Sequence, residues 1–212
     1  MSPLYTQPTA TLLIEYYTDP LCRQSWAFEP CWRQLRAEFG HRFTWRYCLS
    51  GLLPHWATHA IGRPRSSRLA CLAVKCAEQQ GPQAGDLYLR ALRTAALRDG
   101  RDLARPDVLL DIASELAAQL PGLAKQLPSV FDATIFRQGF LHVAATCAPA
   151  NEACAGNSFS VRCIPGLVLR RAGWPDQVIT VNNQPYEALL QALAQAAPDL
   201  FYVASLEEGG AG

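Results

Sequence analysis

Cys22 lies where an apolar run ends and an amphipathic segment begins, in the stretch Thr18-Asp19-Pro20-Leu21-Cys22. This pattern predicts a strand, a short turn and a cysteine at the start of a helix. A thiol at a helix N-terminus faces free backbone N–H groups and the positive end of the helix dipole, so the pKa of Cys22 should fall. We therefore expect Cys22 to be a nucleophile. A dithiol motif would have its second cysteine at Ser25, where this chain has a hydroxyl.

Two prolines are relevant to the structure around Cys22. Pro30 lies within an otherwise helical segment, where it removes one backbone hydrogen bond and is expected to kink the helix. Far downstream, Ile164-Pro165 leads into the apolar run Gly166-Leu-Val-Leu. With these features the chain resembles the DsbA-like family of thioredoxin-fold thiol–disulfide oxidoreductases, with a monothiol CxxS motif. The resemblance implies that Cys22 attacks, that Ser25 replaces the resolving cysteine, and that Pro165 is the cis-proline facing the motif.

The periodicity of apolar residues predicts the elements that would position this motif. Strands are expected over 11–17 and 43–49, with a helix to about residue 39 between them. Helical spacing runs from 66 to about 145, strands follow over 161–170 and 177–181, and Pro185 opens a last helix. We therefore expect an α/β, thioredoxin-like fold with an all-helical insertion. The predicted thioredoxin-like domain comprises 10–61 and 147–200, the inserted helical subdomain 62–146, and a flexible C-terminal tail 201–212.

Composition limits the classes of partner. The 212 residues carry a formal net charge of +1, and the arginines are scattered among acidic residues. We therefore predict no nucleic-acid partner and no membrane partner. The first residues lack the basic and apolar regions of a signal peptide, which predicts a cytoplasmic protein. The sequence indicates no oligomeric state.

Eight cysteines in a chain of this length, without a recognisable leader, are expected to be reduced. We expect Cys48, Cys71 and Cys76 to be small buried hydrophobes, and we favour free thiols for Cys147 and Cys154 over a local disulfide or half of a metal site. His55 and His59 share a helical spacing, but no carboxylate accompanies them. No metal site and no bound cofactor are predicted.

Three accounts of function remain open at this level. In the first, Cys22 attacks a protein disulfide or a glutathionylated protein, and glutathione or another thiol acts as the resolving co-substrate. In the second, Cys163 resolves Cys22, although strand alternation would point its side chain away if Ile164 faces the motif. Cys31, nine residues along the same helix, is too distant to do so. In the third, the chain is a redox-impaired adaptor that holds a peptide or protein partner in the groove beside the cis-proline.

The site residues follow from the first account. Cys22 is the predicted catalytic nucleophile, and Ser25 is predicted to donate a hydrogen bond to its thiolate. We expect Arg23 and Gln24 to tune that thiolate, and Trp26 to line the substrate site beside them. Ile164 and Pro165 are expected to present their backbone to the substrate. Kappa-class glutathione transferases resemble this chain in fold, but they have serine at the Cys22 position, which argues against their chemistry here.

Overall fold

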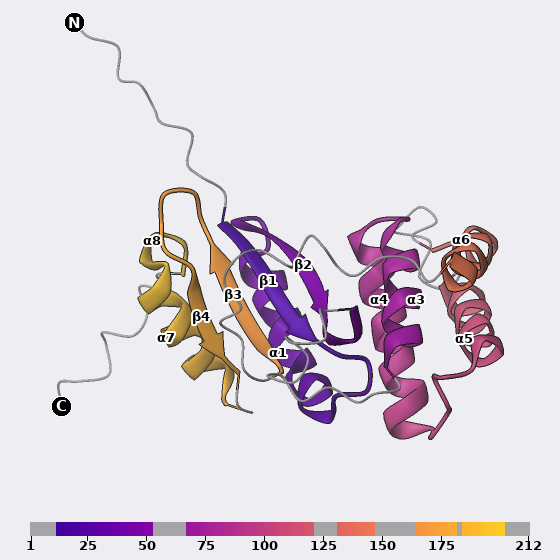
Figure 1. Cartoon of the computed structure of the whole chain (residues 1–212). Helices are drawn as coiled ribbons and strands as arrows, with labels where there is room; N and C mark the ends of the chain where they lie inside the picture. Colours follow the sequence, from indigo (N-terminus) through magenta and orange to yellow (C-terminus); the bar gives the residue numbers. More distant parts are fainter. Residues whose placement is uncertain (1–11, 53–66, 121–130, 147–163, 182–183, 202–212) are drawn as a thin grey trace, which may run out of the picture.

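A four-stranded sheet forms the centre of the protein (Figure 1). The computed structural model describes residues 12–52, 67–120, 131–146, 164–181 and 184–201. The strands, in the spatial order β2-β1-β3-β4, are β1 (Leu12–Thr18), β2 (Phe43–Leu49), β3 (Gly166–Arg170) and β4 (Gln177–Thr180). β1 pairs with β2 in parallel and with β3 antiparallel, and β3 pairs antiparallel with β4.

One helix crosses between the two parallel strands and covers a face of the sheet. This helix, α1 (Arg23–Phe39), connects β1 to β2. Tyr16 of β1 contacts its Phe28 and Trp32, with ring centroids 5.6 and 5.1 Å apart. Two further helices follow β4, α7 (Tyr186–Ala196) and a short α8 (Pro198–Phe201) that the sequence did not predict. The parallel β1-α1-β2 unit with the antiparallel β3-β4 pair is the thioredoxin-like arrangement.

The remaining helices all fall between β2 and β3 in the chain. They are η1 (Ser50–Leu52), α3 (Arg68–Glu78), α4 (Pro82–Arg93), the π-helical turn η2 (Thr94–Arg98), α5 (Pro106–Gln119) and α6 (Ala133–Thr146). The predicted fold, thioredoxin-like with an all-helical insertion, is confirmed. The predicted limits at 61/62 and 146/147 and the tail from 202 onward lie outside the described residues, so those boundaries stay predictions. Phe201, predicted as the first residue of the flexible tail, is instead buried at the end of α8, where its ring packs against Phe39 and Phe43.

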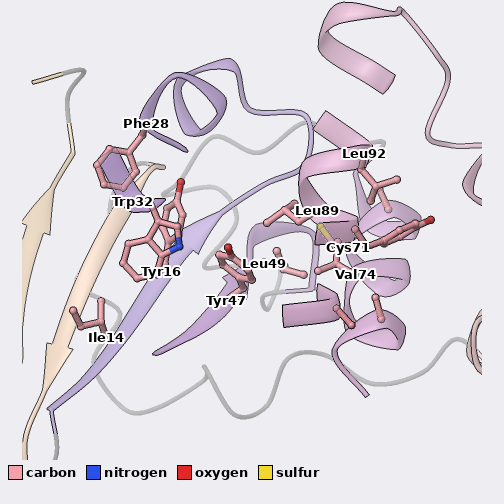
Figure 2. Packing of buried hydrophobic residues seen from close by; sticks show 14 of the residues in the cluster. Ile14, Tyr16, Phe28, Trp32, Tyr47, Leu49, Cys71, Val74, Leu89 and Leu92 are labelled. Atoms are coloured by element: carbon pink, nitrogen blue, oxygen red, sulfur yellow. The ribbon is translucent and has the colours of Figure 1, made fainter. Parts of the chain in front are cut away.

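The hydrophobic core runs without a break from the sheet into the insertion. Figure 2 shows it passing from the α1 face of the sheet to the helices of the insertion, through Ile14, Tyr16, Phe28, Trp32, Tyr47, Leu49, Cys71, Val74, Leu89 and Leu92. Tyr47 of β2 also donates a hydrogen bond to Asp86 of α4, 2.5 Å away. The insertion is therefore packed against the sheet as part of one core.

The opposite face of β1 carries a buried charge that the apolar pattern did not indicate. Glu15 is 0% exposed and pairs with Arg46 of β2 and with Arg170 of β3, the latter at 2.9 Å. Tyr17 donates a hydrogen bond to the same carboxylate, and burial together with this negative charge raises the pKa of Tyr17 to about 12. Ion pairs between one buried carboxylate of β1 and arginines of β2 and β3 therefore stand on this face in place of apolar contacts.

Two expectations need correction. The strand expected over 161–170 begins at Gly166, and residues 161–163 lie outside the described part of the chain. Cys71 and Cys76 are reduced, buried thiols as predicted, whereas Cys48 is buried but disulfide-bonded, so the expectation of a reduced thiol there was wrong. The partner of Cys48 lies outside the described residues.

Across the described ranges, no helix has the length and apolarity needed to cross a membrane.

Candidate active site

Cys22 is the N-cap residue of α1. Its backbone is extended (φ −84°, ψ 112°), and its carbonyl accepts the first helical hydrogen bond, from Trp26 N at 3.0 Å. Its sulfur accepts a hydrogen bond from the backbone N–H of Ser25 at 3.4 Å. A negative charge on this sulfur would be stabilised by that N–H and by the helix dipole, since both are most favourable at an N-terminus. The side chain is partly exposed, so a substrate can reach it.

Ser25 contacts the thiol in a different way from the one predicted. Its backbone amide, and not its hydroxyl, bonds to the Cys22 sulfur. The Ser25 side chain is fully buried, and its Oγ has no hydrogen-bond partner among the residues that the structure describes. The predicted hydroxyl–thiolate hydrogen bond is therefore absent, because the residue one turn into the helix points into the core. Removing such an unpaired hydroxyl should cost little stability.

Ile164 and Pro165 reach the motif from the other end of the chain. The Ile164–Pro165 peptide bond is cis, and the Ile164 carbonyl lies 3.9 Å from the Cys22 sulfur, within reach of the thiol proton. The Pro165 carbonyl accepts a hydrogen bond from Val181 N at 3.4 Å, which ties this turn to the end of β4. The structure thus brings together two segments that are 142 residues apart in sequence.

The other predicted site residues line the approach to the thiol. Arg23 and Gln24 are exposed in the first turn of α1, beside Cys22. Trp26 is half-buried, one turn after Cys22, and lines a cavity between α1 and the insertion. Arg23 carries its positive charge next to the thiol without an ion pair to any described acidic residue. These positions suit residues that meet a substrate rather than residues that hold the fold.

Asp19 is a site residue that sequence reasoning missed. It is completely buried in the turn between β1 and α1. Its carbonyl accepts a hydrogen bond from Cys22 N at 3.2 Å, and its carboxylate accepts one from Leu21 N at 2.9 Å and another from the Ser50 hydroxyl. Asp19 therefore fixes the turn that presents Cys22. An acidic residue three positions before the cysteine was the only signal available in the sequence.

Comparison with protein families supports the same interpretation. A family model described as thioredoxin matches residues 16–146, more than half of the chain. The chain belongs to this thioredoxin family. Within the family it has the DsbA-like form, in which a helical insertion separates the two parts of the thioredoxin-like sheet.

Several proteins are similar to this thioredoxin-family chain. The ClpXP adapter protein SpxH of Shouchella clausii is 30% identical over 145 residues, which cover 55% of this chain and 48% of SpxH. This chain spans about half the length of the curated relatives it matches. Pseudomonas aeruginosa DsbA superposes with a TM-score of 0.56 at 16% identity, covering 93% of this chain and 91% of DsbA. A candidate protein disulfide isomerase from Nitrosomonas europaea superposes with a TM-score of 0.55 at 22% sequence identity, covering 89% of this chain and 98% of the isomerase. These two similarities show the shared fold.

Some predicted residues of this family member lie outside the described ranges. They are the alternative resolving residue Cys163, the cysteines Cys147 and Cys154, and the histidines His55 and His59. Within the described residues, no group of three or more His, Cys, Asp or Glu side chains is arranged to hold a metal ion.

Asp19→Asn is expected to change the pH dependence of stability. Burial raises the pKa of Asp19 above its ordinary value of 3.8, against the opposing hydrogen bonds from Ser50, Leu21 and Ser67. A carboxyl whose folded-state pKa is raised stabilises the fold below its unfolded pKa and loses that contribution as the pH rises. The free energy of unfolding of the wild type, minus that of Asp19→Asn, should therefore fall as the pH rises above about 4. Urea unfolding at several pH values measures this difference, and a difference that grows with pH would show a lowered pKa instead.

Proposed function

We propose that the protein catalyses thiol–disulfide exchange through Cys22 as a monothiol enzyme. The Cys22 thiolate attacks the glutathione sulfur of a glutathionylated protein. A Cys22–glutathione disulfide forms, the original S–S bond breaks, and the protein sulfur leaves as a thiolate. A second glutathione thiolate then attacks the bound glutathione sulfur, so that oxidised glutathione forms and the Cys22 thiolate is regenerated. Protein disulfides would enter by the same first step.

One observation carries this proposal: the Cys22 sulfur lies at the α1 N-terminus, between the Ser25 amide and the Ile164 carbonyl. The amide supports the thiolate before attack and after release. Arg23 adds a positive charge beside it, and Gln24 offers an exposed amide to the substrate. The backbone of Ile164 and Pro165 borders the sulfur, where an extended substrate segment could pair with it. Glutathione as the resolving thiol suits the predicted cytoplasmic location, which stays a prediction.

Restoring a second thiol tests the monothiol mechanism. The Ser25 backbone amide lies 3.4 Å from the Cys22 sulfur. A thiol at position 25 is therefore close enough to form a disulfide with Cys22 once its side chain turns from the core toward that sulfur. In Ser25→Cys the new thiol should attack the Cys22–glutathione disulfide and release glutathione. We expect the Cys22–glutathione adduct to accumulate in the wild type. In the variant it should be replaced by an internal disulfide between Cys22 and the introduced thiol, as read by peptide mass mapping after treatment with oxidised glutathione.

Ser25→Ala is the matched control for this experiment. It removes the unpartnered hydroxyl without adding a thiol, so it should keep the wild-type adduct and the wild-type unfolding midpoint. If Cys22 is instead recovered in a disulfide with another cysteine of the chain in both the wild type and Ser25→Ala, that cysteine resolves Cys22, and the monothiol mechanism is wrong.

A second candidate function is that of an adaptor. The name of the SpxH relatives, ClpXP adapter proteins, favours it. A protein partner bound beside Ile164 and Pro165 would not need the thiol, because backbone pairing provides the contact. An adaptor should bind its partner equally well with Cys22 or with serine at that position. Partner capture that is lost together with the thiol would instead identify the partner as a redox substrate.

A further inference from the structure

A cavity of about 630 Å³ lies between α1, the α4–η2 segment and α5. Trp26, Pro30 and Arg33 line it from α1, and residues within 87–101 and 112–120 complete its walls. Its volume is within the range of ligand sites in proteins. The π-helical turn η2 forms part of the wall, and such turns often occur at functional sites. We call this space the insertion cleft.

The insertion cleft follows the side of α1 on which Cys22 lies. Cys22, Trp26 and Arg33 are separated by four and seven residues, so they fall along one stripe of the helix. Trp26, one turn after Cys22, is the lining residue of α1 that lies nearest to the thiol in sequence. The α1 wall from Trp26 to Arg33 spans about 10 Å, at 1.5 Å per residue. The helical part of the α4–η2 wall, from Leu87 to Arg98, spans about 17 Å. An extended segment of about three to five residues fits such a length, at about 3.3 Å per residue.

Arginine side chains outnumber acidic side chains by one in the lining of the insertion cleft, and Arg90 is already paired with Glu29 at 2.7 Å. Four arginines line it, opposed by three acidic residues: Arg33, Arg90, Arg98 and Arg101, with Glu29, Asp99 and Glu115. Arg33 is exposed and forms no ion pair with an acidic residue in the described parts of the chain. Arg98 and Arg101 pair with Asp99 and Glu115, whose side chains are 41% and 56% exposed. Exposed pairs of this kind are weak, so both guanidinium groups can turn to a bound carboxylate.

We infer that the insertion cleft binds an acidic, extended segment of the substrate protein, near the protein cysteine whose disulfide Cys22 attacks. This inference rests on the proposed function for the identity of the partner as a substrate. Binding itself needs no sulfur chemistry. A peptide without cysteine therefore tests the cleft separately from the exchange reaction.

The probe is a fluorescein-labelled hexapeptide of alternating Glu and Gly, compared with its Lys–Gly counterpart by fluorescence polarisation on the full chain. We expect the acidic peptide to bind at least tenfold more tightly than the basic one, and its affinity to fall severalfold between 20 and 300 mM salt, because exposed charges are screened. Equal binding of the two peptides would overturn the inference. So would complete displacement by glutathione at a concentration equal to that of the peptide, which would indicate a small-anion site.

Three variants are expected to change the affinity for the acidic peptide in different directions. Arg33→Glu should weaken binding of the acidic peptide about fivefold. Glu115→Gln should strengthen it about twofold, because Arg101 loses its competing carboxylate. Arg137→Glu reverses an exposed charge on α6, away from the insertion cleft, and should change nothing. Equal weakening by Arg33→Glu and Arg137→Glu would show a general charge effect and contradict the site. If binding fails while exchange at Cys22 proceeds, only this inference is lost.

Discussion

Cys22→Ser is expected to abolish exchange, reducing the release of glutathione from a glutathionylated peptide to the rate of the uncatalysed reaction. The loss should be on the order of 100-fold or more, because a hydroxyl at neutral pH is no nucleophile toward sulfur. Serine is a favoured N-cap residue, so α1 keeps its cap and the fold should be retained. The measurement is the rate of peptide release with excess glutathione, together with the urea midpoint of both proteins.

Cys31→Ser is the matched control for the loss of a thiol. Cys31 lies further along α1, and burial, with a contribution from Glu187, raises the pKa of its thiol, so it should contribute little to exchange. This variant should keep the wild-type rate. If the Cys22→Ser protein retains substantial activity, another cysteine is the nucleophile, and the proposed role of Cys22 is wrong.

Glu29→Ala should cause a large loss of stability. Glu29 is buried between α1 and α4, where Arg93 donates a hydrogen bond to it at 3.2 Å and Arg90 Nε lies 2.7 Å from its other oxygen. Arg93 is 1% exposed and also donates a hydrogen bond to Thr18. Removing the carboxylate leaves a buried guanidinium without its counter-charge, which costs about 3–5 kcal/mol. Urea unfolding at neutral pH measures the loss.

Two companion proteins test whether the unpaired charge is the cause. The double variant Glu29→Ala, Arg93→Met removes both charges and should recover much of the stability, because replacing a buried ion pair with apolar groups is often neutral. Asp99→Ala breaks the exposed pair with Arg98 and should leave the urea midpoint unchanged. If the double variant is no more stable than Glu29→Ala, the stability lost in Glu29→Ala comes from lost packing and not from the unpaired charge of Arg93.

Local patterns were sufficient to predict most of the elements. The apolar run before Cys22, the alternation over 43–49 and the helical spacing after residue 66 correspond to β1, β2 and the helices of the insertion. Pro82 and Pro106 each occupy a first helical turn, and Pro185 precedes the first turn of α7. These features depend on neighbouring residues alone, so the sequence could indicate them.

The polar contacts that hold the site could not be predicted in the same way. Asp19, Ser50 and Ser67 meet in one buried cluster although up to 48 positions separate them. Ser25 was predicted to turn its hydroxyl to Cys22, but the helical phase directs it into the core and leaves only its amide for the thiol. The charges around Glu15 and Glu29 likewise depend on arginines brought by other elements. Such contacts are set by tertiary packing, which periodicity does not contain.

Glutathionylation measured cysteine by cysteine tests the central claim most directly. The native chain and the urea-unfolded chain are treated with oxidised glutathione at neutral pH, and adduct formation is followed by peptide mass spectrometry at Cys22, Cys31 and Cys76. Burial raises the pKa of Cys76 to about 11, so Cys76 is the unreactive reference within the same molecule. The proposed mechanism predicts that Cys22 reacts faster in the native chain than in the unfolded one, while Cys31 and Cys76 react more slowly. If Cys22 reacts no faster when native than when unfolded, the helix N-terminus does not activate it, and the protein is no exchange enzyme.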